Sequence, residues 1–142
     1  MRIILSIALL LMTSACTTMK YGSLLGIESP DHSMVVVDAM QKMTEHYLPA
    51  KSSLVLGQEV KKKDVFGHDL LSAIRKKGYS IQEYMIDSEQ QSGIEFKYRL
   101  DKVEDLVYLA LHFDDTTLSR AYGNVDGKLM PNGSWSRMEH EK

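Results

Sequence analysis

The stretch SSLVLGQEVKKKDVFGHDLLSAIRKKGYSIQEYMI, residues 52–86, decides the class of fold. Residues 52–56 are rich in strand-forming side chains and predict a buried strand. Asp64 then suits the N-cap of a helix, behind which apolar residues recur at helical spacing: Phe66, Leu70, Leu71 and Ile74. Gly78 is placed to end this helix in the left-handed conformation. A second strand is expected over residues 79–86, so the stretch predicts a β-α-β unit.

Another helix is expected upstream of this unit, from an N-cap at Ser29 or Asp31 to about Tyr47. Its apolar positions fall on one helical face: Val36, Met40, Met43 and Tyr47. Leu48 precedes Pro49, and the residue before a proline is disfavoured in the α region. The helix should therefore end at this point.

Three or four antiparallel strands are expected downstream of the polar loop at residues 87–93. Residues 95–100 alternate between apolar and polar, a charged turn is expected at 101–105, and residues 106–113 suit a central strand. Residues 117–125 and 128–138 flank Asp126-Gly127, which favours a tight hairpin, and Pro131-Asn132-Gly133 predicts a second turn or a bulge. The order of elements indicates an α+β domain, with an N-terminal helix, the β-α-β unit and helices packed on one face of the sheet.

The N-terminus, MRIILSIALLLMTSAC, resembles a bacterial lipoprotein signal. Arg2 precedes an apolar run at residues 3–12, which is too short for a membrane span of about 20 residues. Cys16 follows three small residues, so cleavage is expected before it and lipid is expected on its thiol. Thr17 in place of aspartate favours the outer membrane, facing the periplasm. The alternative is an ordinary cleaved signal with a stray cysteine.

This interpretation divides the chain into a signal peptide at residues 1–15, a lipidated flexible tether at 16–30 and a single periplasmic α+β domain at 31–142. The length suits one small domain. A net charge of −2 gives no electrostatic case for binding nucleic acid. With one cysteine, the chain has neither a disulfide scaffold nor a Cys-based zinc site.

Motifs that would indicate an enzyme are missing from the sequence. The five histidines show no zinc spacing, and no nucleophile elbow, P-loop or dinucleotide fingerprint occurs. The basic runs at 61–63 and 75–77 suit a solvated surface, although together they could contact anionic lipid head groups near the anchor. We therefore expect an anchored adaptor with no cofactor, metal or small-molecule substrate, apart from the acyl chains on Cys16.

Trp135 stands out near the C-terminus because it is the only tryptophan and lies beside Arg137 and near Tyr122. Tryptophan, tyrosine and arginine are the residue types most enriched at interface hot spots. A tryptophan in the core of the domain is the alternative. The pattern favours a partner surface in the last strands.

Four stretches together resemble the TrbH family, lipoproteins encoded with the mating-pair-formation genes of conjugative plasmids. They are MKYGSLL, MTEHYLPAKSSLVL, DVFGHDLLSAIRKKGYSI and, most specific, LSRAYGNVDGKLMPNGSWSRMEHEK, which lie at residues 19–25, 43–56, 64–81 and 118–142. The resemblance covers essentially the whole chain. It implies an outer-membrane lipoprotein that supports the channel or pilus of a conjugative type IV secretion system.

The resemblance transfers only Cys16 as a functional residue. By inference alone, the contact residues for other subunits, in particular the outer-membrane core, are Arg120, Tyr122, Trp135 and Arg137. Two rival classes remain: an exclusion or surface-exposed lipoprotein that blocks incoming transfer, and a periplasmic enzyme acting on the cell wall. No pair of carboxylates in the sequence makes a credible acid–base pair for the latter.

Overall fold

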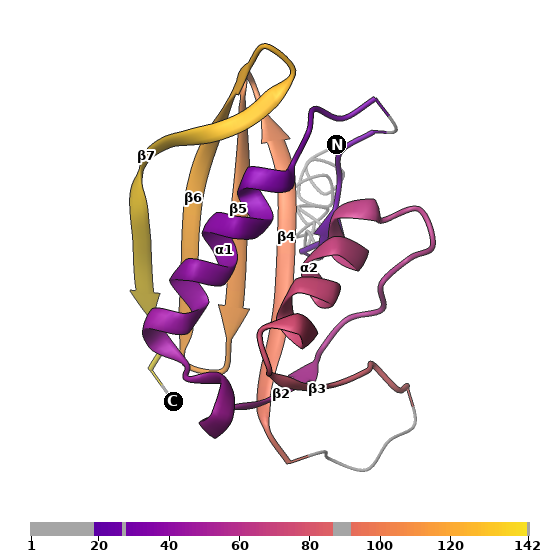
Figure 1. The fold of residues 1–142 in the computed structure, drawn as a ribbon, viewed down its shortest axis with the longest axis vertical. Coiled ribbons are helices and arrows are strands. Elements are labelled where there is room, and N and C mark those ends of the chain that lie inside the picture. The colour runs from indigo at the N-terminus through magenta and orange to yellow at the C-terminus, as the bar shows by residue number, and fades with distance from the viewer. Residues whose placement is uncertain (1–18, 27, 87–91, 142) are drawn as a thin grey trace, which may run out of the picture.

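The computed structural model describes residues 19–26, 28–86 and 92–141. Signal cleavage and lipidation at Cys16 therefore lie outside the described residues and stay predictions. Within the described parts the chain forms two α-helices and a seven-stranded, mostly antiparallel sheet, which confirms the α+β class. Both helices cover the same face of the sheet (Figure 1).

The helices are α1, Ser33–His46, and α2, Val65–Lys76, with a short 3₁₀ turn, Pro49–Lys51, after α1. The strands, in chain order, are β1, Gly22–Ser23; β2, Ser53–Leu56; β3, Ser80–Gln82; β4, Ile94–Val103; β5, Leu106–Phe113; β6, Thr116–Val125; and β7, Lys128–Glu139. The order across the sheet is β3-β2-β4-β5-β6-β7, and β1 also pairs with β4. Sequence patterns therefore located nearly every element.

Helix α2 begins and ends as its sequence predicts. The Asp64 carboxylate accepts a 2.7 Å hydrogen bond from the Gly67 N–H, which satisfies one of the unpaired donors in the first turn. At the other end Gly78 has φ +98°. The Gly78 and Tyr79 N–H groups bond back to the carbonyls of Arg75 and Ile74, which closes a Schellman motif.

Helix α1 ends at His46, just before Leu48-Pro49 as expected, but its start differs from the prediction. His32 occupies the N-cap position without a side-chain cap. Asp31 lies one residue earlier and accepts a 2.8 Å bond from the Ser33 N–H. Asp31 also bridges to β7, since its N–H donates to Gly127 O and its C=O accepts from Leu129 N. The chain around Asp31 therefore follows the sheet before the helix begins.

Three predicted segments around β4 need correction. The strand expected over 79–86 is only three residues long, because β2 offers partners only for Ser80, Ile81 and Gln82. The turn expected at 101–105 is narrower, since β4 continues to Val103 in register with Leu106. Glu104 lies in the turn, with a φ of 56°.

The third correction concerns the expected flexible tether. Gly22–Ser23 form β1 beside β4, on the same edge that β2 occupies further along the strand. Gly22 has φ +93°, a conformation that favours glycine. Two residues in the middle of the expected tether are thus paired with the sheet.

Strands β4 to β7 form an antiparallel meander in which β5 is central, as predicted. The register between β6 and β7 shifts between Ser119 and Ala121, where Gly133 in β7 has φ +91°. The predicted bulge after Pro131 is therefore present. Because the bulge lies opposite Arg120, it affects the direction of the Trp135 side chain.

The core lies between the helices and the covered face of the sheet. Its largest fully buried side chains are Tyr98, Tyr122, Phe66, Phe96 and Met43. Tyr98 and Tyr122 come from strands and direct their hydroxyls toward an aspartate in a helix or at its N-cap. Their partners define the sites described next.

Candidate functional site

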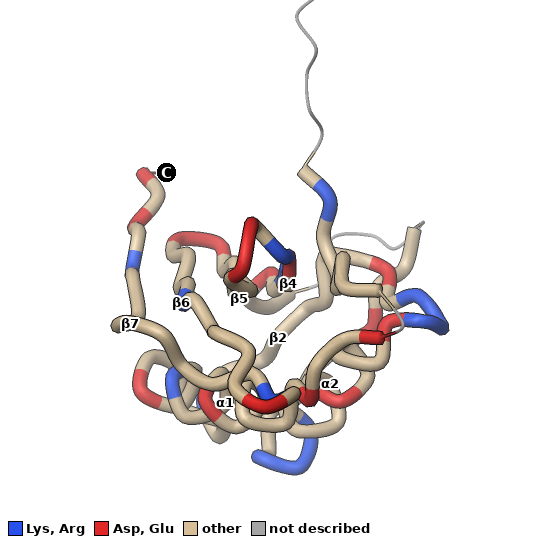
Figure 2. The backbone as a smooth tube through the Cα atoms, turned by 90° about the horizontal axis from the view of Figure 1, so that it is seen from above, with Lys and Arg blue, Asp and Glu red and all other residues tan. Residues whose placement is uncertain are grey.

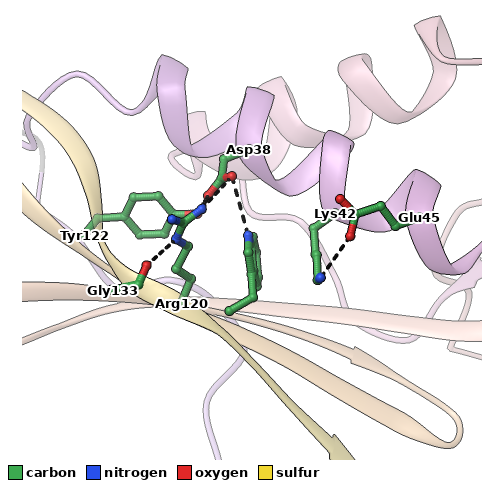
Figure 3. Close-up of polar contacts among 7 residues, drawn as sticks. Asp38, Lys42, Glu45, Arg120, Tyr122 and Gly133 are labelled. Carbon is green, nitrogen blue, oxygen red and sulfur yellow. Dashed lines mark hydrogen bonds and ion pairs between the residues drawn. The ribbon is translucent and has the colours of Figure 1, made fainter.

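Three of the four residues expected at a partner surface converge instead on one carboxylate of helix α1 (Figure 3). Arg120 Nη1 lies 2.9 Å from both Asp38 oxygens. The Tyr122 hydroxyl donates to Asp38 Oδ2 at 2.6 Å, and Trp135 Nε1 donates to Asp38 Oδ1 at 3.4 Å. We call this group the Asp38 junction. It attaches α1 to β6 and β7.

The bulge in β7 builds this junction. Arg120 and Tyr122 are two residues apart on β6, so both point to the face that α1 covers. Arg120 Nε also donates to the Gly133 carbonyl at 2.9 Å, and the guanidinium lies 6.0 Å from the Trp135 ring centre. The side chains of Asp38 and Arg120 are only 14% and 21% exposed. The ion pair is therefore shielded from water and stronger than a surface pair.

Arg120, Tyr122 and Trp135 each donate hydrogen bonds to internal acceptors at the Asp38 junction. Burial, helped by the hydrogen bond to Asp38, raises the pKa of the Tyr122 phenol well above its ordinary value. The phenol thus stays a neutral donor and not a proton-transfer group at neutral pH. The arrangement suits the attachment of a helix to a sheet.

Arg137 is the one expected contact residue that lies apart from this junction. Its guanidinium is half exposed and pairs with Glu139 of the same strand at 2.8 Å. Contact of Arg120, Tyr122, Trp135 and Arg137 with a partner stays a prediction, and Arg137 is the residue that offers an exposed cation for it.

A second aspartate junction lies at the start of α2. The Asp64 carboxylate accepts from the Gly67 N–H, from the Tyr98 hydroxyl at 2.6 Å and from the Ser23 N–H at 3.1 Å. Burial, followed by the hydrogen bond to Asp64, raises the pKa of the Tyr98 phenol. We call this group the Asp64 junction. It joins β1, α2 and β4 through one side chain.

Gly67 makes the Asp64 junction possible. A Cβ atom there would overlap the Tyr98 hydroxyl and lie 2.7 Å from Asp64 Oδ2. Sequence reasoning found Asp64 only as a helix cap and missed its links to Tyr98 and Ser23. The available signal was the Asp-x-x-Gly spacing at the helix start, which leaves space beside the cap.

A cavity of about 490 Å³ opens beside the Asp64 junction. Its apolar lining includes Leu24, Leu25, Val65 and Phe66, and its charged lining includes His32, Glu59, Lys61 and Lys63. His32 Nε2 is engaged with Asp69 at 2.7 Å. The cavity lining therefore combines apolar side chains with two lysines.

The uncovered face of the sheet carries a smaller hollow of about 400 Å³. There Thr117 Oγ1 lies 3.1 Å from His112 Nδ1 and 2.7 Å from His140 Nε2, and Tyr21 packs edge-on against His112. Burial, then the neighbouring His140, lowers the pKa of His112. Across the described parts of the chain, no three His, Cys, Asp or Glu residues are grouped to hold a metal ion.

No helix in the described ranges is long and apolar enough to cross a membrane. The model of one protein family, Conjugal transfer protein TrbH, matches residues 18–139. No curated protein and no solved structure matched the chain in the other two comparisons. The family match spans both aspartate junctions and the whole sheet. The chain belongs to the TrbH family of conjugal transfer proteins.

Proposed function

We propose that this protein is an outer-membrane lipoprotein that faces the periplasm and acts as an adaptor, not an enzyme, in a conjugative type IV secretion apparatus. The observation that carries the proposal is the family match over residues 18–139. The lipoprotein-like signal that ends at Cys16 supports it independently, because the signal lies outside the matched region.

The attachment of β1 to β4 limits how far the domain can lie from the anchor. Five residue steps separate Cys16 from Tyr21, which bounds the distance between them at about 18 Å for a fully extended chain. The domain would then lie close to the membrane surface. Anchoring of this kind raises the effective concentration of the domain for partners in the same membrane.

The partner we propose is an outer-membrane subunit of the secretion channel. A stable contact would bury about 800 Å² on each side. Arg137 is available for such a contact because it is half exposed and its ion pair, with Glu139, lies within its own strand. Arg120, Tyr122 and Trp135 would support the contact indirectly, by fixing β7 against α1.

The test is plasmid transfer from a donor with an in-frame deletion of the gene, complemented in trans. A large drop in transfer that the wild-type copy restores is expected. Unchanged transfer would contradict the adaptor role. Recipients that express only this protein should accept plasmid normally. Blocked acceptance would instead identify an exclusion lipoprotein, and clearing of peptidoglycan in a zymogram would identify a cell-wall enzyme.

A further inference from the structure

The rim of the 490 Å³ cavity combines exposed apolar side chains with lysines. Val65, the first residue of α2, is 61% exposed, and Leu24 is 40% exposed. Leu25 lies between them and the core, partly buried. We call Leu24, Leu25, Val65 and residues 61–63 together the Lys61 face. Exposed apolar groups beside cations are typical of surfaces that rest on a lipid bilayer.

The three lysines of the Lys61 face are free to meet an external anion. All are exposed, and none forms an ion pair with a described residue. Glu59 is the exposed carboxylate in the cavity lining, whereas Asp64 is buried and bonded to Ser23, Gly67 and Tyr98. Figure 2 shows the basic segment before α2 at one edge of the molecule. Residues 61–63 therefore present three exposed cations beside one exposed carboxylate of the lining, although the whole chain is slightly acidic.

The location of the Lys61 face points to a membrane. Tyr21 lines the same cavity and lies five residues after Cys16. Lys20, the residue before it, is also exposed and adds a fourth cation on the approach to the anchor. The face is thus continuous with the segment through which the domain would be attached.

The structure also supplies a second basic run on the same helix, away from the Lys61 face. Arg75, Lys76 and Lys77 lie at the opposite end of α2, about 18 Å away for a twelve-residue helix. Arg75 is paired with Glu83 at 3.1 Å. This run is the internal control for basic charge at another position on the domain.

We propose that the Lys61 face rests on an anionic phospholipid surface, with Val65 and Leu24 among the acyl–headgroup boundary and the three lysines on lipid phosphates. The inference deepens the proposed function and rests on its lipid anchor. Lysines next to an anionic membrane each favour contact by about fivefold. The anchored domain would then be held in one orientation and present β7 away from this contact.

The test uses the mature lipidated protein, reconstituted into vesicles of phosphatidylcholine alone or with phosphatidylglycerol. A photoreactive p-benzoylphenylalanine replaces Val65 in one variant and Val37 in the control. Both valines are about equally exposed, at 61% and 58%, but Val37 lies on α1. Cross-linking to lipid is expected at position 65, increased by phosphatidylglycerol, and not at position 37. Equal cross-linking at both positions would overturn the inference.

Lysine variants separate charge from anchoring. Lys61→Gln with Lys62→Gln should lower the ratio of contacting to free orientations by about fivefold per lysine, whereas Lys76→Gln with Lys77→Gln should leave it unchanged. Equal losses from the two pairs would contradict the assigned face. Flotation with neutral vesicles reports the anchor alone. A wild-type protein that fails to float would overturn the proposed function, and the inference with it. A protein that floats but does not cross-link to lipid at position 65 would overturn the inference only.

Discussion

The Asp38 and Asp64 junctions perform the same task by different means. Each places a tyrosine hydroxyl of the sheet 2.6 Å from an aspartate in a helix or at its N-cap. Asp64 precedes α2 and takes two of its three donors from backbone N–H groups. Asp38 lies inside α1 and takes all its donors from the side chains of Arg120, Tyr122 and Trp135.

This difference shows which contacts between a helix and the sheet can be predicted from the sequence. Asp64 caps the residue three positions later, so its role follows from local spacing. The donors of Asp38 lie 82, 84 and 97 residues away and meet it only after the sheet has formed. Without its tyrosine, Asp64 should therefore still be held by backbone N–H groups. The Asp38 junction has no such backbone donors in the described parts of the chain, so it should depend on the contacts between the Asp38 carboxylate and the three side chains.

Asp38→Ala should have the largest effect on stability. It leaves the shielded Arg120 guanidinium without its partner and the buried Tyr122 hydroxyl without an acceptor. The free energy of unfolding should fall by about 3 kcal/mol, measured by urea denaturation. Glu83→Ala breaks an exposed pair with Arg75 and should lower it by less than about 1 kcal/mol. Similar losses in the two variants would show that Asp38 does not fasten α1.

Gly67→Ala should be next, because the added methyl group displaces the Tyr98 hydroxyl from Asp64. Crowding in a packed site lowers stability by about 1–3 kcal/mol, to be followed by thermal unfolding. Gly123→Ala is the control, since the nearest atom to its Cβ would be Asn132 Nδ2 at 3.7 Å. A neutral Gly67→Ala variant would mean that the Asp64 junction is looser than described.

The two tyrosines allow a direct comparison of the junctions. Tyr98→Phe and Tyr122→Phe each remove one hydrogen bond to a carboxylate that keeps other donors. Each should lower the unfolding free energy by about 1.5 kcal/mol. A much larger loss for Tyr122→Phe alone would show that Arg120 and Trp135 do not hold Asp38 without the tyrosine.

Alkaline pH should weaken both junctions. Since folding raises the pKa of Tyr98 and of Tyr122, their contribution is complete below the unfolded value of about 10 and is lost as pH rises through the folded values. Stability measured from pH 9 to 12 should fall less steeply in the double phenylalanine variant. Tyr47 and Tyr79, whose pKa values burial also raises, should keep part of the slope. An unchanged slope would show that Tyr98 and Tyr122 do not cause the loss of stability at high pH.

Arg137→Ala should have the smallest effect on stability, within about 0.5 kcal/mol for an exposed pair. Its consequence should instead appear in plasmid transfer, if the proposed partner surface includes β7. Normal transfer with a normally folded Arg137→Ala protein would remove this residue from that surface. Arg120→Ala would not separate the two effects, because Arg120 is bonded to Asp38 and Gly133.

Local chemistry explains what the sequence could predict. Pro49 and Gly78 set helix boundaries through their backbone preferences, and Asp64 does so through its side-chain cap. Asp126-Gly127 forms the turn of the β6–β7 hairpin. The length of β3 and the pairing of β1 depend on partner strands, so the local pattern did not reveal them. The residue types of Trp135, Tyr122 and Arg120 were informative, but these side chains contact α1. Strand alternation directs Arg120 and Tyr122 there, and Trp135 joins them beyond the bulge at Gly133.

The most direct test of the account is Cys16→Ser in the donor, with transfer frequency and membrane fractionation measured together. The account predicts that the wild-type protein carries lipid and fractionates with the outer membrane. The variant should remain as precursor in the inner membrane, and transfer should fall toward the level of the deletion. Normal fractionation and full transfer of the Cys16→Ser variant would contradict an adaptor anchored through this cysteine.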